Sequence, residues 1–252
     1  MKPLFLITND DGYYSRGLQH LVSVAGEFGD VVVMAPDRNA SGLSTSITTS
    51  RPLRVHPVGN GTENHFACDG TPADCVKMGY EHFCPRRPDI VLSGINYGSN
   101  ASINVIYSGT IGAVLEACLD GFAAIGFSVL SHSPETDFNA CTPTIRHILQ
   151  QALLHPIPAG SALNVNIPRL PANQIKGVKV CRQAQAQWVD SLEKRTDPIG
   201  RPYWWMTGKF VCDNPPHDSD QYALNQGYVS VVPIRPDFTD YAAFGSIQYF
   251  EK

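Results

Sequence analysis

The chain carries little charge and no long apolar run. Of its 252 residues, 17% are charged and 43% are hydrophobic, and the formal net charge is −4. This acidic balance argues against binding to a nucleic acid duplex, which requires neutralised phosphates, while the apolar fraction argues against disorder and suffices for one large domain. No stretch approaches the roughly 20 apolar residues of a membrane span, and the N-terminus has only four consecutive apolar residues before Thr8, where a secretory signal needs roughly 7–15. A globular, cytoplasmic chain with no membrane partner is therefore expected.

Several familiar catalytic patterns are absent as well. The seven cysteines are odd in number and contain no C-x-x-C pair, so neither a disulfide framework nor a thiolate zinc site is indicated. Most of them are expected to be small buried hydrophobes in a reducing compartment. The eight histidines form no H-E-x-x-H or H-x-H, and the chain lacks G-x-S-x-G, G-x-G-x-x-G and the P-loop motif. Zinc proteases, serine hydrolases, dinucleotide-binding proteins and P-loop NTPases are thus poorly supported.

What the first 170 residues do contain is an alternation of strand-like and helix-like patterns. Unbroken apolar strands separated by helices predict a mostly parallel sheet that is covered on both faces. The expected strands are 4–8, 31–35, 90–92, 123–130 and 163–167, and the expected helices are 17–28, 110–119 and 142–154.

The pattern changes after Pro171. Strands are expected at 178–181 and 187–189, and turn residues at 196–201 precede an aromatic stretch at 203–206, which together predict a long hairpin. A two-stranded hairpin with exposed aromatics is not stable alone, so it either folds back on the core or pairs with another subunit. Pairing is the favoured interpretation, which makes about 183–225 an oligomerisation extension of a single domain 1–252. A short helix at 222–225 and a strand at 227–233 follow.

Two adjacent carboxylates, Asp10 and Asp11, follow the first strand within Asn9-Asp10-Asp11-Gly12. Asn, Asp and Gly are ordinary turn residues, so a simple turn is one interpretation. Ligands, however, bind at the carboxyl ends of strands in open α/β sheets, and buried like charges need a cation, a shared proton or full hydrogen bonding. These residues alone leave both interpretations open.

Three further loops follow strands or precede a helix, and each has a simple structural interpretation. They are the polar connection 36–46, the Gly- and Asn-rich loop 93–100, and Tyr107–Thr110, which provides helix N-caps. Together they would bring carboxylates, a hydroxyl and an amide oxygen beside a helix N-terminus. Mg²⁺ and Mn²⁺ prefer such oxygen ligands, and a helix N-terminus binds phosphate. Hydrolysis of a phosphomonoester is the chemistry that this combination favours.

At this point the chain resembles the SurE family of stationary-phase survival proteins, over nearly its whole length. The segments that carry the resemblance are ITNDDGYYSRGLQ (7–19), VVVMAPDRNASGLSTSIT (31–48), DGTPADCV (69–76), RPDIVLSGINYGSN (87–100), VIYSGTIGAVLEA (105–117), LNVNIP (163–168), RTDPIGRPYWW (195–205) and YALNQGYVSVVPI (222–234). Two departures are Ser219-Asp220, where the family often has Thr-Asp, and Ala73, where Thr is usual.

The resemblance implies a Rossmann-like three-layer α/β/α core and a homodimer or homotetramer that exchanges C-terminal elements. It implies hydrolysis of nucleoside 5′- and 3′-monophosphates, with some activity on polyphosphate. One Mg²⁺ or Mn²⁺ per subunit would be held by Asp10, Asp11, Ser41 and Asn96, and the two aspartates would be the catalytic residues. The implied phosphate contacts are Asn96, Asn100, Ser108, Gly109 and Thr110.

In the expected mechanism the ion lowers the pKa of a water molecule, and one of the two aspartates orients or deprotonates it. The sequence does not decide which aspartate does so, and an aspartyl-phosphate intermediate is a minor alternative. Two other classes of function compete with hydrolysis. One is a regulatory module that binds a nucleotide or phosphate without turnover, and the other is an assembly protein built around the hairpin.

Overall fold

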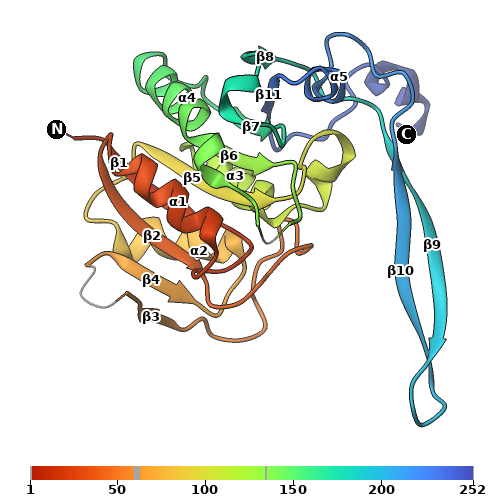
Figure 1. The fold of residues 1–252 in the computed structure, drawn as a ribbon, viewed down its shortest axis with the longest axis horizontal. Coiled ribbons are helices and arrows are strands. Elements are labelled where there is room, and N and C mark those ends of the chain that lie inside the picture. The colour runs from red at the N-terminus through yellow and green to blue at the C-terminus, as the bar shows by residue number, and fades with distance from the viewer. Residues whose placement is uncertain (1, 60–62, 134, 252) are drawn as a thin grey trace.

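A nine-stranded, mostly parallel sheet forms the centre of the protein (Figure 1). The computed structural model describes residues 2–59, 63–133 and 135–251. The strand order is β3-β4-β2-β1-β5-β6-β7-β11-β8, and the run from β4 to β7 is parallel throughout, whereas β3 and β11 are antiparallel to their neighbours β4 and β7. The strand bounds are β1 Leu4–Thr8, β2 Asp30–Pro36, β3 Val55–Pro57, β4 His65–Cys68, β5 Ile90–Tyr97, β6 Ala123–Val129, β7 Ala162–Ile167, β8 Val178–Val180 and β11 Val229–Ile234.

Helices cover both faces of this sheet. The helices α1 (Arg16–Ala25) and α4 (Thr142–Leu154) pack on one face, and α2 (Pro72–Met78) and α3 (Gly109–Leu119) pack on the other. Strand β1 illustrates why both faces need cover, because its successive apolar side chains point to opposite faces of the sheet. Phe5 and Ile7 join the core beneath α1 and α4, while Leu4 and Leu6 join the core beneath α2 and α3. The predicted α/β fold with three layers is confirmed.

Element bounds agree best where the local pattern is strong. The fourth helix has the predicted bounds, whereas β3, β4 and α2 were not predicted. The prediction of a loop at 93–100 is wrong for residues 93–97. Strand β5 continues to Tyr97, because Ser93 pairs with Thr8 of β1 and Tyr97 pairs with Val129 of β6. Five of the seven cysteines are buried and all seven are free thiols, as the sequence predicted.

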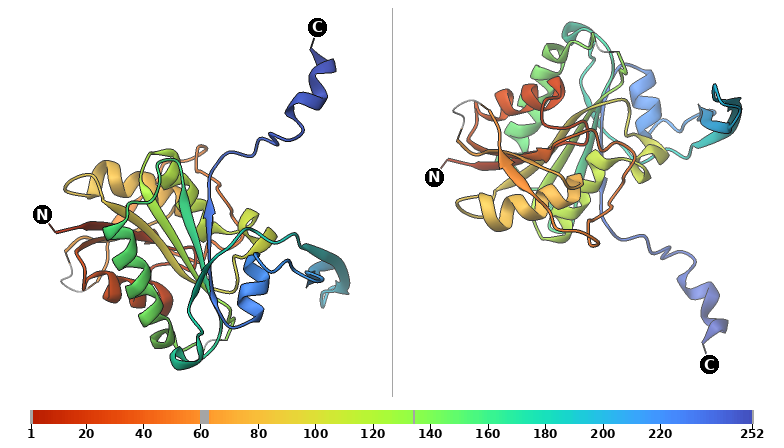
Figure 2. Two further views of the ribbon diagram at one scale, coloured as in Figure 1. Left: turned by 90° about the horizontal axis from the view of Figure 1, so that it is seen from above. Right: turned by 90° about the horizontal axis from the view of Figure 1, so that it is seen from below.

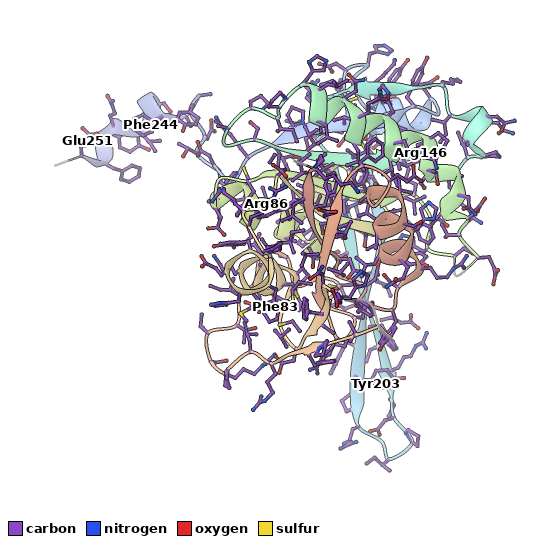
Figure 3. All side chains as sticks on the ribbon, turned by 90° about the vertical axis from the view of Figure 1, so that its left-hand side faces the viewer. Phe83, Arg86, Arg146, Tyr203, Phe244 and Glu251 are labelled. Atoms are coloured by element: carbon purple, nitrogen blue, oxygen red, sulfur yellow. The ribbon has the colours of Figure 1, made fainter. Side chains whose placement is uncertain are left out.

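Two extensions project from this body. The strands β9 (Gln187–Thr196) and β10 (Pro202–Val211) form an antiparallel arm with every residue of β9 exposed, and the tail after β11 runs in another direction to the 3-10 helix η5 (Phe244–Phe250) (Figures 1 and 2). Figure 3 places Tyr203 of the arm and Phe244 of the tail away from the body. The short helix α5 (Asp220–Asn225) lies near the base of the arm. In the described part of the chain, no helix is long and apolar enough to cross a membrane.

Candidate metal and phosphate site

Three strand ends and one helix N-terminus meet around Asp10 and Asp11. The backbone N–H of Ala40, in the loop after β2, donates to the carbonyl of Asp10 at 2.7 Å. The backbone N–H of Tyr97, at the end of β5, donates to the Asp11 carboxylate. The first turn of α3 contributes Thr110, whose hydroxyl donates to Asp10 Oδ1 at 2.5 Å. The loops predicted from the sequence therefore converge in space.

The turn that carries the two aspartates is fixed by its flanking residues. The Asn9 side chain donates to the Gly12 carbonyl at 3.1 Å and to Ser15 Oγ at 2.7 Å. Gly12 has φ +95°, and a Cβ there would lie 3.2 Å from the backbone of Arg38 in the loop after β2. Only glycine readily adopts this conformation in so narrow a space. The simple turn therefore exists, and it also holds the acidic pair against the second loop.

Asp10 lies against the N-terminus of α3. It is buried, and burial raises the pKa of its carboxyl, while hydrogen bonds from the Thr110 hydroxyl and from the backbone N–H groups of Thr110 and Gly109 oppose that rise. A Cβ on Gly109 would come within 2.8 Å of Asp10 Cβ, so the helix approaches the carboxylate as closely as a glycine allows. The positive end of the helix dipole favours a negative charge at this position.

Asp11 is the less satisfied of the pair. Burial and the neighbouring charge of Asp10 raise its pKa to about 7, against a hydrogen bond from the Tyr97 N–H that lowers it. Its Oδ2 atom is buried and has no hydrogen-bond partner among residues 2–59, 63–133 and 135–251. Two adjacent carboxylates, one buried and the other half-buried with an unpartnered oxygen, form an environment that a divalent cation would satisfy.

The other two predicted ligands are chain neighbours of residues that bond to this pair, because Ser41 follows Ala40 and Asn96 precedes Tyr97. The amide nitrogen of Asn96 donates to the Gly98 carbonyl at 2.9 Å, which leaves its amide oxygen available to a cation. Ser41 is exposed and directly follows Ala40, and its backbone N–H donates to Asn39 Oδ1 at 2.8 Å. Across the described residues no three His, Cys, Asp or Glu side chains group closely enough to hold a metal. A cation here would therefore need the hydroxyl and the amide in addition to the two carboxylates.

The predicted phosphate residues divide into two kinds. Ser108 caps α3 by accepting from the Ile111 N–H at 3.1 Å, and a hydroxyl that accepts one bond can still donate another. The backbone N–H groups of Gly109 and Thr110, expected to face a phosphate, instead hydrogen-bond to Asp10. Of this set, Ser108 retains a hydroxyl hydrogen for a ligand, whereas Gly109 and Thr110 support the carboxylate.

Asn100 is tied into a buried amide network that sequence reasoning missed. Its backbone N–H donates to Asn166 Oδ1 at 2.8 Å, its carbonyl accepts from Asn164 Nδ2 at 2.8 Å, and its side chain donates to Ser128 Oγ at 2.8 Å. Asn164 and Asn166 are further linked to each other at 2.9 Å. The available signal was two asparagines spaced i, i+2 in an otherwise apolar strand, which places both on one face of β7.

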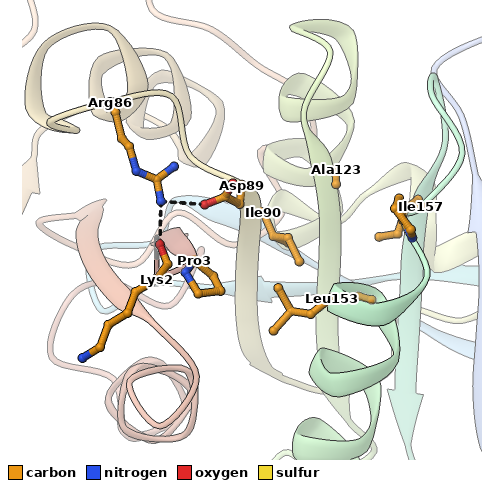
Figure 4. A pocket seen from close by; sticks show the side chains of 10 residues that line it. Lys2, Pro3, Arg86, Asp89, Ile90, Ala123, Leu153 and Ile157 are labelled. Atoms are coloured by element: carbon orange, nitrogen blue, oxygen red, sulfur yellow. Dashed lines mark hydrogen bonds and ion pairs between the residues drawn. The ribbon is translucent and has the colours of Figure 1, made fainter.

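A cavity of about 430 Å³ lies at the opposite end of the strands and has different chemistry (Figure 4). It is bordered by the amino ends of β1, β5 and β6, and its guanidinium, from Arg86, is engaged by the Lys2 carbonyl and by Asp89 at 2.8 Å each. Because ligand sites in open α/β sheets lie at the carboxyl ends of the strands, the Asp10–Asp11 region is the better candidate.

Comparisons with known proteins point to one family. Residues 5–190 match the family model described as "Survival protein SurE". A protein of Christiangramia forsetii named 5′-nucleotidase SurE is 49% identical over 94% of this chain and 93% of its own length, and one of Flavobacterium johnsoniae with the same name is 45% identical over 94% and 93%. The crystal structure of the SurE protein from Aquifex aeolicus superimposes with a TM-score of 0.87 at 38% identity, covering 99% of this chain and 100% of that one.

Proposed function

This chain belongs to the survival protein SurE family, and on that premise we propose that it is a 5′-nucleotidase that depends on one divalent metal ion per subunit. The names of its relatives support the nucleotidase activity itself. The observation that carries the metal dependence is the Asp11 carboxylate, which lies beside the buried Asp10 and has a buried, unpartnered oxygen within the described residues.

The ion would be held by Asp10, Asp11, Ser41 and Asn96. When bound, Mg²⁺ or Mn²⁺ supplies a Lewis acid for a phosphate oxygen and lowers the pKa of a water molecule. The protein's own contribution begins with Asp10, which Thr110 and the N-terminus of α3 orient, with hydrogen bonds that oppose the rise of its pKa on burial. We assign the orientation of the attacking water to Asp11, because its Oδ2 lacks such a donor within the described residues.

The phosphate would bind next to the same helix N-terminus. In this proposal Ser108 donates its hydroxyl hydrogen to a phosphate oxygen, and Asn96 and Asn100 would supply further contacts. The substrates proposed are nucleoside 5′- and 3′-monophosphates, with polyphosphate as a secondary substrate. A module that binds phosphate without hydrolysing it would have no use for two adjacent carboxylates at the site, and the acidic pair therefore favours the enzyme over that alternative.

We also propose a cytoplasmic homo-oligomer, a dimer or a tetramer, in which the arm at about 183–225 and the C-terminal tail contact other copies. The arm exposes Trp204, Trp205 and Met206 by 53%, 57% and 79%, and the tail exposes Phe250 by 75%. Apolar side chains gathered on extensions of this kind are typical of surfaces that a partner covers.

Phosphate release after chelation tests the activity. The protein is stripped with EDTA, then assayed with AMP, GMP, 3′-AMP and polyphosphate, with Mn²⁺ or Mg²⁺ added back. We expect no release without metal and recovery with it. Asp11→Asn should lower turnover by about a hundredfold or more with the fold retained, whereas Asp30→Asn, at the other end of the sheet, should not. Metal-independent release, or near-normal turnover of Asp11→Asn, would refute the proposal.

A further inference from the structure

Asp220 is a fully buried carboxylate that the proposed chemistry does not use. Its Oδ2 accepts from the Ser102 N–H at 2.7 Å, and its Oδ1 accepts from the Ala184 N–H at 3.0 Å and from the Gln221 N–H at 2.7 Å. A buried carboxylate bonded to backbone N–H groups fixes those backbones, since leaving either side unpaired in the interior is unfavourable.

Ser102 shows what this carboxylate holds in place. Its φ is +56°, in the left-handed region that non-glycine residues avoid unless their surroundings impose it. Besides the N–H bond to Asp220, its hydroxyl donates to the Ala184 carbonyl at 2.8 Å. Two bonds from two directions thus hold one residue in an unfavourable conformation.

The position of Ser102 explains why its contacts with Asp220 and Ala184 matter for the proposed site. Ser102 begins the 3-10 helix η2 (Ser102–Ile106), within the loop that leads from Asn100 to Ser108. Ala184 lies three residues before the arm strand β9. A second contact between the arm and this loop follows at Trp188, whose Nε1 donates to Asn104 Oδ1 at 2.8 Å. The phosphate-side loop and the root of the arm are therefore attached to the same carboxylate.

We infer that Asp220 is a positioning residue, which sets the backbone of the loop 100–108 and thereby the placement of Ser108 for phosphate, and which joins that loop to the root of the arm. The inference rests on the proposed function for its kinetic consequence. The amide network of Asn100 holds one end of the loop and α3 holds the other, so Asp220 supplies the support in the middle.

The test compares Asp220→Asn with Asp218→Asn. An amide at position 220 keeps one acceptor oxygen and places an N–H donor where the other oxygen was, so at least one of the three bonds from backbone N–H groups is lost. Asp218 makes the matched control, because it lies on the same segment but is exposed and pairs with Arg182 at the surface. We expect the KM for AMP to rise about tenfold in Asp220→Asn, with kcat within about twofold. Asp218→Asn should leave both constants unchanged.

A rescue separates positioning from a general structural role. Glycine adopts positive φ at no steric cost. Ser102→Gly in the Asp220→Asn background should therefore reverse at least about a third of the rise in KM. If Asp220 served only overall stability, this second change would not help. Where Asp220→Asn does not fold, Ser102→Ala, which removes only the bond to the Ala184 carbonyl, is measured instead, with a rise of about threefold expected.

A signal that needs no turnover completes the design. With Trp204 and Trp205 replaced by Phe, Trp188 is the only tryptophan left, and its emission reports the contact with Asn104. Asp220→Asn should shift this emission to longer wavelength without substrate, and Asp218→Asn should not. An unchanged KM and emission, or a KM effect that Ser102→Gly leaves intact, overturns the inference. If wild-type protein releases no phosphate, the proposed function fails. The emission still decides whether Asp220 joins the loop 100–108 to the root of the arm.

Discussion

The hydroxyl of Thr110 donates to Oδ1 of Asp10 at 2.5 Å, joining residues that lie 100 positions apart. Both side chains are buried, and Thr110 belongs to the first turn of α3 while Asp10 follows β1. The bond fixes the orientation of the carboxylate and favours its ionised form against the burial that raises its pKa. A carboxylate oriented in this way is prepared for a cation before the cation arrives.

Replacing Thr110 with valine tests this relationship. The change keeps the shape of the side chain and removes the donor, so the Asp10 carboxyl should be harder to ionise and weaker as a ligand. We expect about tenfold more Mn²⁺ to be needed for half-maximal activity. Activity is titrated with metal in chelator-treated protein, and Thr144→Val on α4, another buried threonine, is the control. Identical metal requirements in both variants would show that the Thr110 hydroxyl does not prepare Asp10.

The pKa of Asp11 predicts how the metal-free protein responds to pH. Its folded-state pKa is raised from 3.8 to about 7, so between these values the folded chain holds a proton that the unfolded chain has released. The contribution of Asp11 to the free energy of unfolding should therefore be largest below about pH 4, and it should be lost as the pH rises to about 7. Thermal unfolding in EDTA from pH 5 to pH 8 measures the fall.

Two comparisons tie that fall to the carboxyl pair. Asp11→Asn cannot titrate at this position, so most of the decrease in Tm between pH 5 and pH 8 should disappear. Mn²⁺ added to the wild-type protein should raise Tm most at pH 8, where Asp11, with its pKa of about 7, has released its proton and lies ionised beside Asp10. An equal slope in Asp11→Asn would assign the pH dependence to other groups.

The apolar pattern within single segments predicted most of the central fold. The remaining elements depend on pairing between strands that are distant or poorly marked in the sequence. The apolar periodicity of α4 and the continuous apolar runs of β1 and β6 are visible within single segments, which is why these elements were predicted. The strand β3 is short and mostly exposed, so it carries no apolar signal. Strand β9 was expected to span three residues and spans ten, because its length is set by pairing with β10 and not by burial.

The same distinction applies to the site. The meeting of the segments that carry Asp10, Asp11, Ser41 and Asn96 could be anticipated, because strand ends of one parallel sheet gather at one edge. The choice of Ser41 and Asn96 as ligands came from the family resemblance and stays a prediction. The supports of the site could not be anticipated. Asp220 reaches Ser102 across 118 positions, and Asn166 reaches Asn100 across 66, so their roles exist only once the chain has folded.

Gly112 offers a test in which helix propensity and activity should move in opposite directions. Alanine favours a helix over glycine, and Gly112 lies within α3. A Cβ there, however, would lie 2.1 Å from the Ser44 carbonyl, in the loop that also carries Ser41. We expect Gly112→Ala to displace that loop and to lower activity by about tenfold, as for a misplaced ligand.

The control for this change is Gly245→Ala, since a Cβ at Gly245 meets no atom within 4 Å. Phosphate release at saturating nucleotide is measured for both variants over a range of Mn²⁺ concentrations. If the loop after β2 supplies a ligand, excess Mn²⁺ should recover part of the activity of Gly112→Ala. Full activity at low metal would mean that the loop shifts without consequence, and Ser41 would then lose its assignment as a ligand.

The arm formed by β9 and β10 is predicted to hold subunits together. A two-stranded ribbon is marginal by itself, and this one exposes Leu192 by 63% and Met206 by 79%, two residues paired across the ribbon. Val189 and Lys209 are also paired, so residues 190–208 can be replaced by an Asn-Gly turn without disturbing the contact of Trp188 with Asn104.

Light scattering should then give a smaller particle than the full-length chain at the same concentration. A subtler pair of variants shows which surface matters. Trp205→Ser with Met206→Ser should lower the mass, because it removes apolar area that a partner would cover. Glu193→Ser with Lys194→Ser changes charged residues of the facing strand, next to the same positions, and should leave the mass unchanged. If the deletion leaves the mass unaltered, the arm does not join the subunits, and the exposed C-terminal tail becomes the segment to remove next.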